Sequence, residues 1–169
     1  MPRARAHVGP ASAFVGLALV WTFPLILRLS SHLPGAVAGD NVAFTWNFWW
    51  MREALSRPDA SVFFTDRLFA PFGIDLTLHT HTALPAFVGA TLLRPLSVVA
   101  AQNIVVLASI ALNGFAAYLL AFCRTGDRQA AVFGGLLFAG SPYVAAHLMG
   151  HFNLISALHK AVRGSDVEG

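Results

Sequence analysis

Long stretches without charge alternate with polar segments along this chain of 169 residues. Three stretches contain no Asp, Glu, Lys or Arg: residues 8–27, 101–123 and 129–159. A helix needs about 20 mostly apolar residues to cross the hydrocarbon core of a bilayer. The third stretch is interrupted at Ser141-Pro142 and Gly150, which favours one span, a turn and the start of a further helix. The pattern predicts membrane-spanning helices at about residues 10–28, 101–123 and 130–148.

A fourth apolar stretch, residues 83–93, ends at Arg94-Pro95 and is too short to cross a bilayer. We expect it to form an interfacial or re-entrant helix. The fold class predicted is therefore an all-α membrane protein. It has about three transmembrane helices, a large external loop at residues 31–100 with juxtamembrane helices, and this short helix.

The distribution of arginines predicts the orientation. If the N-terminus with Arg3 and Arg5 is cytoplasmic, Arg124 and Arg128 also fall on the cytoplasmic side, as the positive-inside rule requires. Arg28 is then on the outer side, where a long side chain can reach the headgroups. We therefore expect a multi-pass membrane protein with a cytoplasmic N-terminus. An alternative for the first stretch is a cleaved signal peptide with an A-x-A site at residues 36–38.

Composition agrees with a bilayer as partner. Of the residues, 56 % are hydrophobic and 11 % charged, and the mean hydropathy is +0.63. Soluble domains carry about 25 % charged residues. The composition argues against a soluble enzyme, a disordered chain and a nucleic-acid-binding protein. The single cysteine, Cys123, excludes an intrachain disulfide and a thiol cluster for a metal.

The external loop holds most of the acidic side chains. Within it, residues 40–56 predict a helix that ends before Pro58. One side of this helix carries Phe44, Phe48, Met51 and Leu55. The other notable group is a tryptophan cluster typical of a membrane-interface belt, formed by Trp46, Trp49 and Trp50.

Asp40, at the start of this helix, has two interpretations. As a helix N-cap, its carboxylate would accept a backbone N–H and favour the positive end of the dipole. As a functional group at the mouth of a membrane cavity, it could take a proton from an acceptor hydroxyl or hold a divalent metal. One side chain can serve both roles.

Histidines form two small groups, His79 with His81 and His147 with His151. The second pair is spaced i, i+4, so both imidazoles lie on one helix face and could contact a phosphate or a metal. The alternative is that these imidazoles only bind headgroups or loop carbonyls. The predicted topology places all four histidines and Asp40 on the outer face, and convergence of ionisable groups in an apolar protein favours a functional site.

Short motifs occur in a fixed order over residues 10–158. They are Gly39-Asp40, Trp46-Asn47-Phe48-Trp49-Trp50, Phe63-Phe64-Thr65-Asp66, Phe69-Ala70-Pro71-Phe72-Gly73, His79-Thr80-His81-Thr82-Ala83-Leu84-Pro85, Gly114-Phe115-Ala116-Ala117-Tyr118-Leu119-Leu120 running to Arg124-Thr125-Gly126, and Ser141-Pro142-Tyr143 followed by His147 and Gly150-His151-Phe152-Asn153-Leu154. In order and spacing the set resembles the N-terminal part of the multi-pass GT-C glycosyltransferases. Within that superfamily it is similar to the bacterial subgroup that is classed with YfhO-like proteins.

That resemblance implies an enzyme of a bacterial inner membrane that transfers sugar from a polyprenyl-phosphate donor to a cell-envelope acceptor on the outer face. It implies that Asp40 is the catalytic base or a metal ligand. His79, His81, His147 and His151 would be substrate-binding residues, and a divalent metal is a candidate cofactor. Family members have many more spans, so we expect residues 1–158 to be a partial GT-C domain and residues 159–169 a polar tail of a truncated fragment. The alternative is a small non-enzymatic membrane protein, a scaffold or a transporter subunit.

Overall fold

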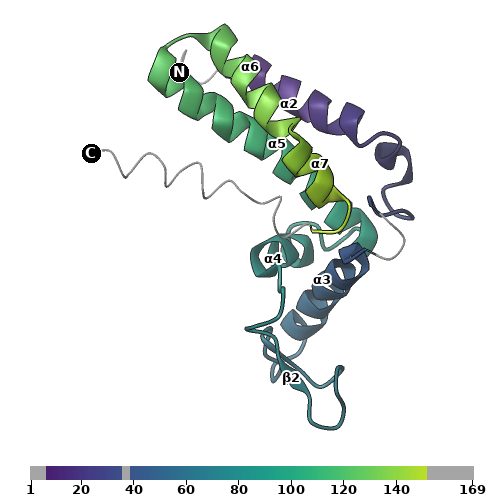
Figure 1. Ribbon diagram of the computed structural model, residues 1–169. Coiled ribbons are helices and arrows are strands. Elements are labelled where there is room, and N and C mark those ends of the chain that lie inside the picture. The colour runs from purple at the N-terminus through teal and green to yellow at the C-terminus, as the bar shows by residue number, and fades with distance from the viewer. Residues whose placement is uncertain (1–6, 36–38, 152–169) are drawn as a thin grey trace.

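The computed structural model describes residues 7–35 and 39–151 and is mostly helical there, with one short hairpin (Figure 1). The predicted all-α class is confirmed at this coarse level. The elements are α2 Val8–Trp21, the 3₁₀ helix η1 Leu25–Arg28, α3 Asn41–Leu55, β1 Phe64–Thr65, β2 Ile74–Asp75, α4 Ala83–Thr91, α5 Val98–Thr125, α6 Arg128–Ala139 and α7 Pro142–Leu148. The antiparallel strands pair Phe64 with Asp75 and Thr65 with Ile74.

Two helical segments are long and apolar enough to cross a membrane, α5 and the segment Arg128–Leu148 formed by α6 and α7. They correspond to the predicted spans at residues 101–123 and 130–148. The second segment is interrupted at Gly140, and α7 restarts with the Ser141 hydroxyl accepting a bond from the Val144 N–H at 3.5 Å. The further helix expected after Gly150 lies outside the described residues.

The span predicted at about residues 10–28 is not shown as one continuous helix. α2 ends at Trp21 after 14 residues, a length of about 21 Å against the roughly 30 Å of a hydrocarbon core. Pro24 has no N–H to continue the helix, and the chain turns before η1. The structure therefore does not show three full-length spans.

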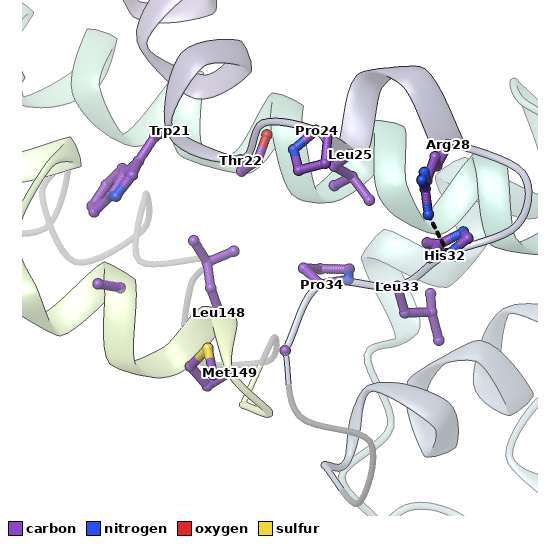
Figure 2. A pocket seen from close by; sticks show the side chains of 12 residues that line it. Trp21, Thr22, Pro24, Leu25, Arg28, His32, Leu33, Pro34, Leu148 and Met149 are labelled. Carbon is purple, nitrogen blue, oxygen red and sulfur yellow. Dashed lines mark hydrogen bonds between the residues drawn. The ribbon is translucent and has the colours of Figure 1, made fainter.

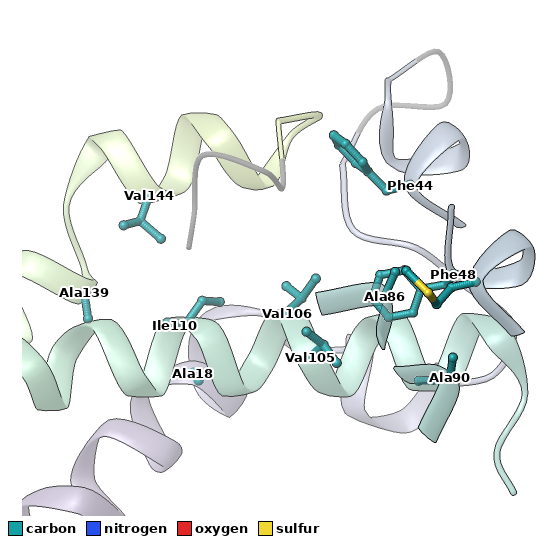
Figure 3. Packing of buried hydrophobic residues seen from close by; sticks show 12 residues of the cluster. Ala18, Phe44, Phe48, Ala86, Ala90, Val105, Val106, Ile110, Ala139 and Val144 are labelled. Atoms are coloured by element: carbon teal, nitrogen blue, oxygen red, sulfur yellow. The ribbon is translucent and has the colours of Figure 1, made fainter. Parts of the chain in front are cut away.

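Helix α5 organises the packing (Figure 3). Its first half contributes Ala101, Val106 and Ile110 to a core that the other helices complete. The partners are Phe44, Phe48 and Met51 from α3, Ala86 and Ala90 from α4, Ala18 from α2, Ala139 from α6 and Val144 from α7. The α3 helix and the hairpin extend beyond the N-terminal end of α5, while α2 and α6 lie along its C-terminal half (Figure 1).

The C-terminal halves of the long helices approach closely around Phe14. Its ring fills the space between α5 and α6, since a Cβ added at Gly114 or Gly135 would lie 2.6 Å from a ring carbon of Phe14. Antiparallel packing of α5 and α6 depends on the short connection at Gly126, whose φ of 66° is the left-handed conformation typical of a helix end.

The helix predicted at residues 40–56 is confirmed as α3, but its buried side differs in part. Phe44, Phe48 and Met51 are buried as expected, whereas Leu55 is 43 % exposed. Ala54 is buried instead, packed with Trp50 and Leu76 beneath the hairpin. The interface-belt interpretation is therefore wrong for Trp50, which is 1 % exposed.

Arg52 joins α3 to α4. Its guanidinium donates to the carbonyls of Gly89 and Leu93, each at 3.1 Å, and to that of Leu96 at 2.8 Å. These carbonyls lie at and beyond the end of α4, where the helix leaves acceptors unpaired and a cation is favourable. Burial, and then the charge of Arg94, lower the pKa of Arg52. The nine-residue α4, expected as an interfacial or re-entrant helix, is thus fixed onto α3.

Candidate functional site

A cleft of about 420 Å³ lies where the end of α2, η1 and residues 33–35 meet the C-terminal end of α7 (Figure 2). We call it the Arg28 cleft. Its walls are formed by Trp21, Thr22, Pro24, Leu25, Arg28, His32, Leu33, Pro34, Gly35, Ala145, Leu148 and Met149. No carboxylate is among these described lining residues. Arg28 and His32 lie at one end of the cleft, and Trp21 and Met149 lie at the other (Figure 2).

A local chain of hydrogen bonds orients the polar end of the cleft. Arg28 Nη1 lies 3.1 Å from His32 Nε2, and His32 Nδ1 lies 2.9 Å from the Ser31 hydroxyl. A guanidinium can only donate, so His32 Nε2 accepts and Nδ1 carries the proton. The imidazole therefore holds Arg28 in place without adding charge. A positive guanidinium beside apolar walls is suited to an anionic headgroup with a hydrocarbon tail.

Three buried amides hold the segment that frames this cleft. Asn103 Nδ2 donates to the carbonyls of Leu29 and His32, each at 2.7 Å. Gln102 Nε2 donates to the Asn41 carbonyl at 3.0 Å. Asn41 Nδ2 in turn donates to the carbonyl of Pro34 at 2.5 Å and to that of Leu148 at 3.1 Å. The first turns of α5 and α3 thus fix residues 29–34, and Asn41 also bonds the end of α7.

Asp40, His147 and His151 lie near this cleft. Asp40 occupies the N-cap position of α3, as predicted, but its side chain makes no capping bond and is exposed. The backbone of Gly150 packs on Gly39 and Asp40, since a Cβ at Gly150 would lie 3.5 Å from Asp40 N. The rings of His147 and His151 are 5.8 Å apart, and His147 Nδ1 donates to the Tyr143 carbonyl at 2.6 Å. The structure therefore brings the second histidine pair to the start of α3.

The other predicted pair lies further along α3. The loop with His79 and His81 contacts this helix at Asn47, whose Nδ2 donates to the Thr80 carbonyl at 3.1 Å. Asn47 is seven residues beyond Asp40, about 10 Å along the helix axis. His79 is exposed, while His81 Nε2 donates to the Val62 carbonyl at 3.1 Å. Burial lowers the pKa of His81, opposed by the Val62 carbonyl and aided by the charge of His79.

Metal binding is limited by this separation. Within residues 7–35 and 39–151, no three His, Cys, Asp or Glu side chains come together in a group that could hold a metal ion. The described side chains therefore do not provide three such ligands for a metal at Asp40. The divalent cofactor stays a prediction.

Sequence reasoning noted Arg28 only as a cation on the outer side and did not include it in the site. Its spacing of four residues from His32 was the available signal, because residues so spaced in a helical turn lie side by side. The amides Asn103 and Gln102, set in an apolar span, were a second signal that a polar partner lies there.

No family model matches the chain, and comparisons with curated proteins and with solved structures find no match. The geometry of the cleft and of Asp40 is therefore the basis for inferring a function.

Proposed function

We propose that this chain is a multi-pass protein of a bacterial plasma membrane, with its N-terminus cytoplasmic and the Arg28 cleft at the outer face. The two long apolar segments support membrane insertion. Asn103 and Arg124 lie 21 residues apart on α5, about 32 Å along its axis, so the cleft and Arg124 lie at opposite ends of a bilayer-length helix. The cytoplasmic side is then the side of Arg124 and Arg128, in agreement with the positive-inside rule.

The function that the geometry supports best is glycosyl transfer from a polyprenyl-phosphate-linked sugar to a cell-envelope acceptor. The observation that carries this proposal is the Arg28 cleft, where a guanidinium at one end faces apolar walls at the other. Exposed Asp40 precedes Asn41, whose amide bonds the Pro34 carbonyl in the cleft wall. A lipid phosphate needs both a cation and an apolar surface, while sugar transfer needs a base near the acceptor. The packing of Gly150 on Asp40 adds His147 and His151 to the same region.

In the proposed reaction, Asp40 takes the proton of an acceptor hydroxyl. The hydroxyl oxygen bonds to the anomeric carbon of the sugar while the bond from that carbon to the phosphate oxygen breaks. The electron pair of the broken bond leaves with the polyprenyl phosphate, whose charge Arg28 stabilises. His147 and His151 are candidate donor contacts. His79 and His81, about two helical turns away, would contact a more distant part of the substrate.

The test compares the full chain with three variants in nanodiscs that contain a radiolabelled polyprenyl-phosphate hexose and a sugar acceptor. Loss of a general base typically lowers rates by about 10² to 10⁴-fold, so Asp40→Asn should abolish measurable transfer while donor binding persists. Arg28→Gln should weaken donor binding. Val42→Ala, at an exposed position in the first turn of α3, is the matched control. Undiminished transfer by Asp40→Asn would refute its role, and absence of both binding and transfer in the unmodified chain would refute the proposal.

The alternative, a non-enzymatic scaffold or transporter subunit, is favoured by one observation, the separation of His79 and His81 from Asp40. A scaffold would purify in a stable complex with other membrane proteins, and Asp40→Asn would leave that complex intact. The transfer assay and this purification therefore distinguish the two functions.

A further inference from the structure

A second hollow lies at the other end of α2 from the Arg28 cleft. It has a volume of about 510 Å³ and lies between the first turns of α2 and α6. We call it the α2–α6 groove. Its lining consists of Gly9, Pro10, Ala13, Arg128, Gln129, Val132, Phe133 and Leu136. Arg128 is at its end, and most of the remaining lining is apolar.

Positive charge is concentrated at this end of the groove. Arg128 is the first residue of α6, and its Nη2 lies 3.7 Å from the position that a Cβ of Gly9 would take in the first turn of α2. Both helices begin here, and neither has an acidic residue in its first turn. Helix starts carry partial positive charge, so a cation beside them is unfavourable and an anion is favourable.

Within the described part of the chain, Asp127 is the acid next to Arg128 in sequence. The Asp127 carboxylate caps α6 by accepting from the backbone N–H groups of Gln129 at 2.8 Å and Ala130 at 3.2 Å. It thereby balances the start of α6, whereas α2 has no side-chain cap bond. Arg124, in the last turn of α5, adds a further cation at the same end of the bundle.

We propose that the α2–α6 groove binds an anionic phospholipid of the cytoplasmic leaflet. Its phosphate would lie against Arg128 and the start of α2, and one acyl chain would lie along Ala13, Val132 and Leu136. Charge complementarity identifies this occupant, because the cytoplasmic leaflet carries the anionic headgroups and the groove continues from the cation into an apolar channel. The proposal rests on the membrane orientation proposed above and is independent of glycosyl transfer.

Selectivity for this lipid comes from the headgroup. An acyl chain leaving the bilayer for the groove moves from one apolar medium to another, so hydrophobic transfer contributes little. A single arginine near an anionic lipid surface contributes about 1 kcal/mol, which corresponds to about a fivefold preference for an anionic over a zwitterionic lipid. Removal of Arg128 should therefore remove about a fivefold preference.

A fluorescent reporter at the groove tests the proposal on the full chain in nanodiscs. Phe133 is 62 % exposed at the groove, so Cys123→Ser combined with Phe133→Cys allows a bimane label there. Quenching by brominated phosphatidylglycerol is compared with quenching by brominated phosphatidylcholine. The native Cys123, which is exposed and does not line the groove, carries the same label as the control site.

We expect phosphatidylglycerol to be preferred at Phe133→Cys, and Arg128→Gln to reduce that preference about fivefold. Arg124→Gln, a loss of the same charge outside the groove, should reduce it less. Ala13→Trp should fill the groove and lower quenching by both lipids while Arg128 is retained. Equal quenching by the two lipids in the unmodified groove overturns the proposal, as does an equal effect of Arg124→Gln. Glycosyl transfer is not measured here, so either result leaves the enzymatic proposal separately testable.

Discussion

Replacing Asn103 with leucine should destabilise the protein by loosening the frame of the Arg28 cleft. Asn103 is fully buried near the start of α5, and its Nδ2 bonds two carbonyls of the segment that follows η1, those of Leu29 and His32. Leucine has nearly the same shape but no donor, so the perturbation is confined to these two bonds.

The magnitude follows from three contributions. A net hydrogen bond contributes about 0.5 to 1.5 kcal/mol, so loss of two bonds costs about 1 to 3 kcal/mol. Desolvated carbonyls left without a partner raise this cost by about 1 kcal/mol or more. In the opposite direction, the buried Oδ1 of Asn103 has no partner among the described residues, and its removal recovers about 1 kcal/mol. We therefore expect a loss of about 2 kcal/mol in the free energy of unfolding.

Unfolding by sodium dodecyl sulfate in bicelles measures this loss. Hydrogen exchange adds a local readout, because the N–H groups of Ser31 and His32 are bonded to the Arg28 carbonyl at 3.1 Å and should exchange faster when the segment loosens. Gln129→Leu, the same kind of change at an exposed site on α6, is the control and should change stability by less than about 0.5 kcal/mol. If Asn103→Leu matches this control and leaves exchange at Ser31 and His32 unchanged, the amide frame does not stabilise the cleft.

Two other predictions concern α3 and its neighbours. Arg52→Met should cost about 2 to 4 kcal/mol, because three carbonyls at the end of α4 lose a charged donor while the aliphatic part of the side chain is retained. Thermal unfolding would measure it, with Arg67→Met as the exposed control, and equal effects would contradict the role of Arg52. His81 should make the loop that carries it pH-dependent. The pKa of His81 is lowered from its ordinary value of 6.5, so just below pH 6.5 the unfolded chain binds more protons than the folded chain. The contribution of His81 to stability is therefore complete above pH 6.5 and is lost as the pH falls from 6.5 through the lowered pKa of the folded state. Hydrogen exchange at Leu76 and His79 would show this, since both N–H groups are bonded within the loop. His81→Gln should abolish the pH dependence and His79→Gln should keep most of it, whereas an unchanged slope in His81→Gln would exclude His81 as its source.

The sequence was sufficient for the elements that depend on local pattern. The apolar runs predicted the two long segments, and the spacing of Phe44, Phe48 and Met51 predicted the buried side of α3. The same reasoning was wrong where tertiary contacts decided the outcome. Trp50 resembled an interface residue, but the hairpin returns over it and buries it with Leu76.

The first predicted span is not shown as one continuous helix, for a local reason. Hydropathy treats residues 10–28 as uniform, whereas the backbone of Pro24 cannot continue the helix that ends at Trp21. This break has a consequence for the candidate site. It turns the chain into η1, where Arg28 Nη1 lies 3.1 Å from His32 Nε2, and it leaves Trp21 on the opposite side of the hollow that results.

The interruption of the last apolar segment has a related effect. A turn at Gly140 and Ser141 ends α6 and allows α7 to begin with its own cap, so the end of α7 is set independently of the α5–α6 packing at Phe14. That end presents the Leu148 carbonyl to Asn41, a contact between residues 107 positions apart. No pattern within one helix specifies such a contact. The cleft thus depends on two helix breaks and on the buried amides of Asn41, Gln102 and Asn103. This explains why its residues could be noted individually in the sequence but not joined into a site.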